Sequence, residues 1–181
     1  MAKENYNSDL YRTGDTSKYL KNFLYGDKFH LKSGDILDEL NISYETYGNL
    51  NKDKSNVVLI CHAISGDSHV AKHDEEDIPG WWDIMVGPGK PIDTENYFVI
   101  CSNVIGGCKG STGPNSIDPS TGTHYGSNFP NITVEDMVSA QNLLIEHLGI
   151  KSILCVTGGS MGGFQSIQWA RQYPDKIKSV I

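Results

Sequence analysis

The stretch Ser152-Ile-Leu-Cys-Val-Thr-Gly-Gly-Ser-Met-Gly-Gly163 decides the fold class of this chain. Its first half is a short apolar run rich in β-branched residues, which is typical of a parallel strand covered on both faces. Its second half contains Gly-x-Ser-x-Gly, and a helix is predicted to begin straight after Ser160 and to run to about Tyr173, where Pro174 ends it. A serine in so sharp a turn has a strained backbone and needs neighbours without side chains. We therefore expect Ser160 to be an exposed catalytic nucleophile; the alternative is a tight turn whose glycines only allow close packing.

Two more apolar runs of the same kind precede this stretch, at residues 56–62 and 97–103. All three runs predict parallel strands in one sheet with helices on both faces. A helix is predicted between the last two of them, because Thr133 and Asp136 form a capping-box-like start and Gly149 provides a stop. The sequence therefore predicts a βαβ unit and an α/β fold with a mostly parallel sheet.

The amino-terminal part is predicted to add the first edge of this sheet. Residues 1–22 are polar and lack periodicity, so we expect a loosely attached arm before a folded domain at 23–181. Segments 28–31 and 36–47 have strand character, and the second alternates as a half-buried antiparallel strand does.

Two long loops and a short last segment complete the predicted organisation. The loops cover residues 63–96 and 104–131 and contain several Gly and Pro residues. Loops of that length in a compact domain usually carry function. Lys178–Ile181 is expected to open another strand, inside which the sequence ends.

The composition points to one globular domain without a charged partner. The chain has 181 residues, 38% of them apolar and 20% charged, with a net charge of −7 and no basic run. This balance argues against nucleic acid or an anionic membrane as the main partner, and no stretch resembles a signal peptide or a membrane span. We expect a soluble cytoplasmic protein with structural, reduced thiols and no metal. The four cysteines, none in a CxxC pair, are Cys61, Cys101, Cys108 and Cys155.

The loop after the first of the three parallel strands is a candidate for transition-state binding. It reads His62-Ala-Ile-Ser-Gly-Asp67. An acyl-transfer site with a strand-to-helix serine takes one oxyanion donor from such a loop and the other from the residue after the nucleophile. The backbone N–H groups of Ile64 and Met161 are therefore the predicted oxyanion donors. His62 is expected to brace the loop rather than to transfer protons.

Five motifs, taken in their order and spacing, resemble the homoserine O-acetyltransferase family. The resemblance extends from about residue 28 to residue 181 and implies an α/β-hydrolase fold. The motifs are His62-Ala-Ile-Ser-Gly-Asp-Ser-His69, Gly80-Trp-Trp-Asp83, Met85-Val-Gly-Pro-Gly-Lys-Pro-Ile-Asp93, Ser102-Asn-Val-Ile-Gly-Gly-Cys-Lys-Gly-Ser-Thr-Gly-Pro114, and Gly158-Gly-Ser-Met-Gly-Gly163 with Gln168-Trp169.

The resemblance implies a ping-pong reaction of methionine biosynthesis. The serine takes an acetyl group from acetyl-CoA, a co-substrate and not a bound cofactor, and passes it to the hydroxyl of L-homoserine. The Gly-rich segment 103–114 is expected near the active-site tunnel, and the full-length form is expected to be a homodimer. Succinyl-CoA as donor, L-serine as acceptor, and a generic serine esterase remain alternatives. Lys109-Gly-Ser-Thr112 does not follow the phosphate-loop order.

The activating partners of Ser160 are missing from the sequence. A triad in this fold continues from Ser to an Asp or Glu and then to a His, but only Asp175 follows Ser160 and no histidine does. We expect the chain to be an incomplete α/β-hydrolase domain that lacks the lid and the last strands, and to be inactive alone. A non-catalytic remnant is the alternative. The histidines that precede Ser160 are His30, His62, His69, His73, His124 and His147.

Overall fold

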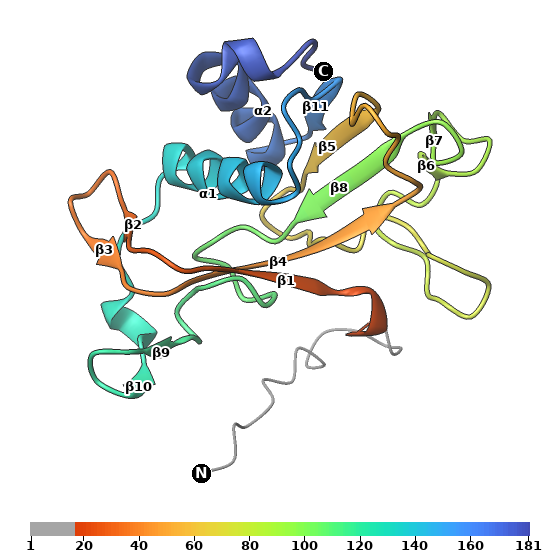
Figure 1. Cartoon of the computed structure of the whole chain (residues 1–181). Helices are drawn as coiled ribbons and strands as arrows, with labels where there is room; N and C mark the ends of the chain where they lie inside the picture. The colour runs from red at the N-terminus through yellow and green to blue at the C-terminus, as the bar shows by residue number, and fades with distance from the viewer. Residues whose placement is uncertain (1–16) are drawn as a thin grey trace.

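The computed structural model describes residues 17–181, so most of the range predicted as a polar arm lies outside the described residues. A central sheet and two α-helices form the body of the fold, and small strand pairs lie in the loops (Figure 1). The central strands are β1 (Lys21–Tyr25), β4 (Leu40–Tyr47), β5 (Val57–Cys61), β8 (Phe98–Ser102) and β11 (Cys155–Gly158), and the helices are α1 (Val134–His147) and α2 (Met161–Gln172). The small strands are β2 (Phe29–His30), β3 (Ile36–Leu37), β6 (Val86–Gly87), β7 (Ile92–Asp93), β9 (Ile117–Asp118) and β10 (Thr123–His124).

The central sheet has the strand order β1-β4-β8-β5-β11. β5 pairs in parallel with β8 on one side and with β11 on the other, which confirms the three predicted parallel strands. β4 is antiparallel to both β8 and β1, so β4 alone runs against the other four strands. The carboxyl ends of β5, β8 and β11 therefore meet at one edge of the sheet, where ligands bind in open α/β folds.

The first edge of the sheet differs from the prediction. The edge strand is β1, which begins at Lys21 within the range predicted as the arm. Residues 28–31 do not join the central sheet, because β2 pairs with β3 in a separate two-stranded unit. The second strand, β4, is not half-buried: most of its residues are buried on both faces, since a helix covers one face and a loop covers the other.

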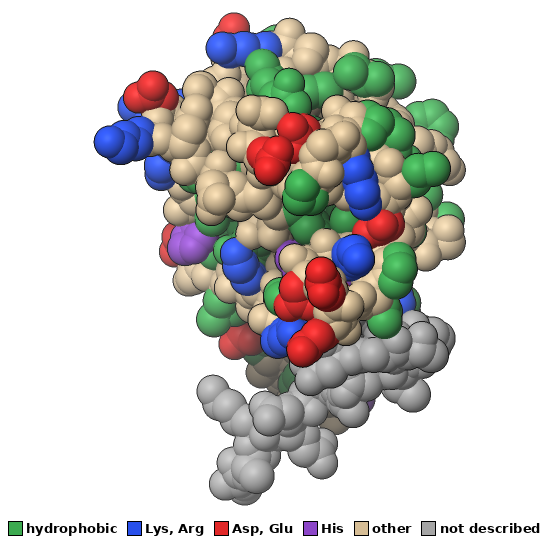
Figure 2. Space-filling model, turned by 90° about the vertical axis from the view of Figure 1, so that its right-hand side faces the viewer, with side chains coloured by type: hydrophobic (Ala, Val, Ile, Leu, Met, Phe, Trp, Pro, Cys, Tyr) green, Lys and Arg blue, Asp and Glu red, His purple; other side chains and the backbone are tan. Residues whose placement is uncertain are grey.

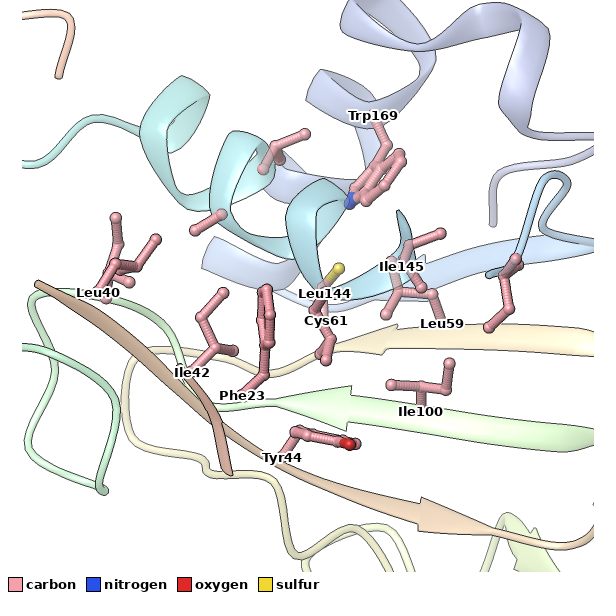
Figure 3. Packing of buried hydrophobic residues seen from close by; sticks show 14 of the residues in the cluster. Phe23, Leu40, Ile42, Tyr44, Leu59, Cys61, Ile100, Leu144, Ile145 and Trp169 are labelled. Carbon is pink, nitrogen blue, oxygen red and sulfur yellow. The ribbon is translucent and has the colours of Figure 1, made fainter. Parts of the chain in front are cut away.

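Both described α-helices lie on the same face of the sheet, whereas helices on both faces were predicted. Leu144 and Ile145 of α1 and Trp169 of α2 pack there against Leu59 and Ile100 of the sheet (Figure 3). The opposite face is covered by the predicted loop 63–96, which forms a second apolar cluster with the strands. The buried loop residues of this cluster are Val70, Ala71 and Val86, and Trp82, Met85 and Ile92 pack against them. Buried apolar side chains of a loop exclude water from the strands as a helix would.

The predicted helix ends are confirmed by the hydrogen bonds at each end. The Thr133 side chain accepts the N–H of Asp136, and the Asp136 carboxylate accepts the N–H of Thr133, which is a complete capping box. Gly149 follows α1 with a φ of 67°, a left-handed conformation that favours glycine. The segment predicted to open a strand, Lys178–Ile181, makes one parallel bridge, Val156 to Val180, and Ile177 just before it makes another with Ile153.

The four cysteines lie in the described part of the chain as free thiols. Cys61 and Cys101 are buried, Cys155 is half-buried and Cys108 is exposed. Burial raises the pKa of the Cys61 thiol to about 12, which keeps the sulfur protonated and unreactive at neutral pH.

Surface charge is mixed on the face that Figure 2 presents, where Lys and Arg side chains are interspersed with Asp and Glu. Neither α1 nor α2 has the length and apolar character that a membrane-spanning helix needs, and no other helix of residues 17–181 has them.

Candidate active site

Ser160 lies between the last residue of β11 and the first residue of α2. Its φ of 57° and ψ of −125° place a non-glycine residue in a region that L-residues rarely adopt. Its carbonyl oxygen accepts the N–H of Gly163 at 2.9 Å and of Phe164 at 3.2 Å, so the strained residue also starts the helix. Ser160 is exposed, and the positive end of α2 begins beside it. The predicted strand-serine-helix turn is therefore present.

Two glycines of the motif bring this turn against the end of β5. A Cβ atom on Gly158 would overlap the Cys61 carbonyl oxygen and would lie 2.8 Å from the Gly162 carbonyl carbon. A Cβ atom on Gly162 would overlap the same Cys61 oxygen and would lie 2.8 Å from the Cys61 carbonyl carbon. Gly159 has open space instead, with no atom within 4 Å of such a Cβ. Close backbone approach thus requires glycine on both sides of Ser160, as predicted, but not at position 159.

The two predicted oxyanion donors lie on one cavity. Ile64 and Met161 both line a cavity of about 380 Å³, together with Gly106, Phe129 and Ile132. Among residues 17–181, no hydrogen-bond acceptor is found for the N–H of Ile64 or of Met161. The side chain of Ile64 is 82% exposed. An unpaired N–H at the residue after the strained serine, with a second at Ile64 on the same cavity, is compatible with stabilising a negative oxygen during acyl transfer.

The His62 ring makes its hydrogen bonds to the backbone of neighbouring loops and not to Ser160. Its Nδ1 lies 2.7 Å from the carbonyl oxygen of Ala63, and its Nε2 accepts the N–H of Val104 at 3.3 Å. Burial lowers the pKa of His62, although the hydrogen bond to Ala63 opposes the shift, so the ring is neutral at physiological pH. A neutral ring with both nitrogens engaged agrees with the predicted bracing role.

A general base for Ser160 is not found among the described residues. No histidine of residues 17–181 is hydrogen-bonded to the Ser160 hydroxyl. His124 bonds to the carbonyl of Asn115 through Nδ1, and His147 stacks on Phe23. Asp175 is exposed in a short 3₁₀ helix, Pro174–Lys176, after α2. The described residues thus include the predicted nucleophile and the predicted oxyanion donors, and none of their histidines is placed as a base for Ser160.

A buried polar cluster that the sequence did not predict lies on the loop-covered face of the sheet. Glu45 Oε2 lies 2.9 Å from His69 Nδ1 and 2.9 Å from His73 Nε2, and the Glu45 side chain is fully buried. Side-chain atoms of these three residues all lie within 4.8 Å of one another, a spacing compatible with metal binding. His73 is also stacked between Tyr19 and Tyr47. The alternating pattern puts Glu45 on the polar face of the strand with Asn41 and Ser43, so nothing in the sequence indicated its burial.

Hydrogen bonding gives His69 a pH-dependent role in stability. Burial lowers the pKa of His69, but the hydrogen bonds to Glu45 and the Ile78 carbonyl, with the charges of Glu45 and Asp77, outweigh it and raise the pKa above 6.5. A group with a raised folded-state pKa adds stability that is complete below its unfolded pKa and is lost as pH rises through the folded value. The groups facing the ring are Glu45, Asp77 and His73.

We expect the free energy of unfolding to fall more steeply from about pH 6 to about pH 8 in the wild type than in His69→Gln. Urea unfolding at a series of pH values measures this difference. Parallel pH profiles for the two proteins would contradict the ionic role of His69.

Comparison with known proteins places the chain among proteins of one fold. Residues 56–181 match a family described as alpha/beta hydrolase fold. The chain is 57% identical over 156 residues, 86% of its length, to a homoserine O-acetyltransferase of Methanosalsum zhilinae, of which it covers 32%. It is also similar to the crystal structure of a homoserine O-acetyltransferase from Bacillus anthracis, with 40% identity and a TM-score of 0.82, covering 89% of this chain and 45% of that one.

A second solved structure carries a different title. The crystal structure of esterase E22 is 40% identical, with a TM-score of 0.81, and the similarity covers 88% of this chain and 47% of that chain. The chain spans about a third of the length of the curated relatives it matches.

Proposed function

Because the chain belongs to the α/β-hydrolase family, we propose that Ser160 is the nucleophile of a homoserine O-acetyltransferase of methionine biosynthesis. The observation that carries the proposal is the strained Ser160 between β11 and α2, next to the unpaired N–H of Met161. The similarity to proteins named homoserine O-acetyltransferase supports an acetyl group as the transferred group and L-homoserine as the acceptor, and acetyl-CoA is the donor that we propose.

The reaction proceeds in two acyl transfers. Ser160 Oγ attacks the thioester carbonyl carbon of acetyl-CoA, the serine proton is transferred to a base, and the C–S bond breaks to release CoA and leave acetyl-Ser160. The homoserine hydroxyl then attacks the ester carbonyl carbon and gives its proton to the base. The C–O bond to Ser160 breaks, the Ser160 oxygen takes a proton back from the base, and O-acetylhomoserine leaves. In both steps the N–H groups of Ile64 and Met161 donate to the carbonyl oxygen as it becomes negative.

The base is proposed to come from outside residues 17–181. Without a base the Ser160 hydroxyl is a poor nucleophile at neutral pH. We expect no measurable acetyl transfer from the 181-residue chain alone, tested with acetyl-CoA and homoserine by release of free thiol. Robust activity would show that one of the histidines before Ser160 serves as base. In the same proposal, the full-length protein works as a cytoplasmic homodimer.

The substrates are tested on the full-length protein. We expect free CoA to be released from acetyl-CoA at a high rate only when L-homoserine is present, because acetyl-Ser160 must be emptied before the next turnover. Replacing acetyl-CoA by succinyl-CoA, and homoserine by L-serine, measures the donor and acceptor preference. A higher rate with either replacement would contradict the substrate assignment while leaving Ser160 as nucleophile.

A serine esterase is the second candidate, and the similarity to esterase E22 favours it. Transfer to water and transfer to homoserine use the same nucleophile and oxyanion donors, so the described site fits both. Two results together would establish the esterase instead. The protein would hydrolyse 4-nitrophenyl acetate at a rate and with products that homoserine does not change, and it would release no CoA from acetyl-CoA.

A further inference from the structure

Glu45 is a fully buried carboxylate in the middle of β4. Its Oε2 lies 2.9 Å from His69 Nδ1 and 3.0 Å from the Tyr47 hydroxyl, and its Oε1 accepts the Ser68 hydroxyl at 3.1 Å. A buried carboxylate is costly unless its oxygens are hydrogen-bonded, so these donors hold one another in place. Two of the donors, Ser68 and His69, belong to the loop that follows β5.

Ser68 links Glu45 to the end of β8. The Ser68 N–H donates to Asn103 Oδ1 at 2.7 Å, and Asn103 Nδ2 donates to the Ser68 hydroxyl at 3.1 Å. Asn103 Nδ2 also donates to the Lys109 carbonyl at 2.6 Å, which reaches the Gly-rich segment 103–114. Ser68 is 0% exposed and Asn103 is 2% exposed, so water does not compete for these bonds. One serine thus joins the β4 carboxylate, the β8 end and the loop.

The position of Ile64 depends on the two ends of this loop. The Ile64 side chain is 82% exposed, so its packing holds the backbone at this position only weakly. At one end His62 Nε2 accepts the Val104 N–H, and at the other end Ser68 and His69 are bonded to Glu45. Between them, a turn joins Gly66 N–H to the Ala63 carbonyl at 2.8 Å. A displacement at Ser68 therefore moves the Ile64 N–H.

We propose that Ser68, held by Glu45 and Asn103, is a positioning residue that fixes the Ile64 N–H for the developing negative oxygen. The inference rests on the proposed role of Ser160 in acyl transfer, because only such a reaction needs an oxyanion donor. Ser68 does not contact substrate and acts through the loop. An error of about 1 Å in a catalytic group lowers rates by about 100-fold, so the effect is measurable.

The hydrogen bonds of the cluster favour this role over metal binding. His69 Nε2 lies 2.9 Å from the Ile78 carbonyl oxygen, which can only accept, and Nδ1 lies 2.9 Å from the Glu45 carboxylate. Both ring nitrogens therefore carry protons in these bonds, and the raised pKa of His69 agrees with a charged ring. A metal ion would have to displace the Nδ1 proton.

The test compares Ser68→Ala with Ser43→Ala in the full-length protein. Ser43 is a matched control because it is 1% exposed, lies on β4, and has a hydroxyl with two hydrogen bonds, to Asn22 and Asn41. We expect Ser68→Ala to lower kcat by about tenfold or more, with KM for the acyl donor unchanged, because an oxyanion donor acts on the transition state. Ser43→Ala is expected to keep kcat. Equal kcat values in the two variants would overturn the proposal.

A second variant covers the case that Ser68→Ala does not fold. Tyr47→Phe removes the hydroxyl that accepts the Val70 N–H and lies 3.0 Å from Glu45 Oε2, while Ser68 is retained. We expect kcat to fall by about threefold, since the loop loses only part of its anchor. An unchanged kcat in a folded Tyr47→Phe protein would overturn the proposal, as would one tightly bound Zn²⁺ per chain that His73→Gln abolishes.

The assay separates this inference from the proposed function. Rates are measured both for acetyl transfer from acetyl-CoA to homoserine and for hydrolysis of 4-nitrophenyl acetate, which needs the same oxyanion donors. Absence of the first activity with retention of the second contradicts the homoserine assignment. The kcat of Ser68→Ala relative to that of Ser43→Ala in the ester assay then still decides the role of Ser68.

Discussion

Ser160→Ala is expected to lower acetyl transfer by the full-length protein by about 10⁴-fold or more, because no covalent intermediate can form without the hydroxyl. The fold should be retained, since alanine differs from serine only by that hydroxyl and meets the same strained φ of 57°. The rate of CoA release with homoserine present measures the loss. Mass spectrometry of the protein after mixing with acetyl-CoA alone should detect an added acetyl group in the wild type and none in the variant.

Ser33→Ala is the control for this prediction. Ser33 is an exposed serine between β2 and β3, and its hydroxyl bonds only locally, to Asp35. The Ser33→Ala variant should be acetylated on Ser160 and should transfer acetyl groups at the wild-type rate. Sustained turnover by Ser160→Ala would show that another residue is the nucleophile, and the strand-serine-helix turn would then serve packing alone.

Gly162→Ala is expected to destabilise the protein by about 3 kcal/mol, at the upper end for an overpacked site. The new methyl group would overlap the carbonyl oxygen of Cys61 and lie 2.8 Å from its carbonyl carbon, and both are backbone atoms of a central strand. Relief requires α2 to move away from the end of β5, which breaks the packing around Trp169. The urea midpoint of unfolding measures the effect, with the slope of the transition as a check on two-state behaviour.

Gly159→Ala is the matched control within the same motif. Its φ is not in the left-handed region, and an added methyl group would meet no atom within 4 Å. We expect its stability to stay within about 0.5 kcal/mol of the wild type or to rise slightly, because alanine has fewer unfolded conformations than glycine. Equal losses for the two variants would mean that contact with Cys61 is not the reason for glycine at position 162.

Local patterns were sufficient to predict the strands and helices that surround Ser160. The run at residues 152–157 and the two earlier runs are apolar and β-branched because helices and loops cover both faces of β5, β8 and β11. Thr133 with Asp136 predicted the start of α1 because capping is a contact between residues three positions apart. The turn at Ser160 was predicted for a similar reason, since its strain is local.

Contacts between distant segments could not be predicted in the same way. β1 is short and follows a polar stretch, so its sequence lacks a strand pattern, and only pairing with β4 establishes it. The loop 63–96 covers a face of the sheet that was expected to carry a helix, because scattered residues such as Val70 and Val86 have no period. The Glu45 cluster joins residues more than twenty positions apart, and its polar members gave no sign of burial.

The contact of Gly162 with Cys61 also constrains the order in which the chain folds. A positive φ at Ser160 costs about 1–3 kcal/mol. While β11 is unpaired, no local contact compensates for this cost. β5 and β11 are distant in sequence, and such non-local pairs form slowly because loop closure must precede their contacts. We therefore expect Ser160 to reach its strained conformation late in folding, after β11 has paired with β5, and a partly folded chain to carry the motif in a relaxed form.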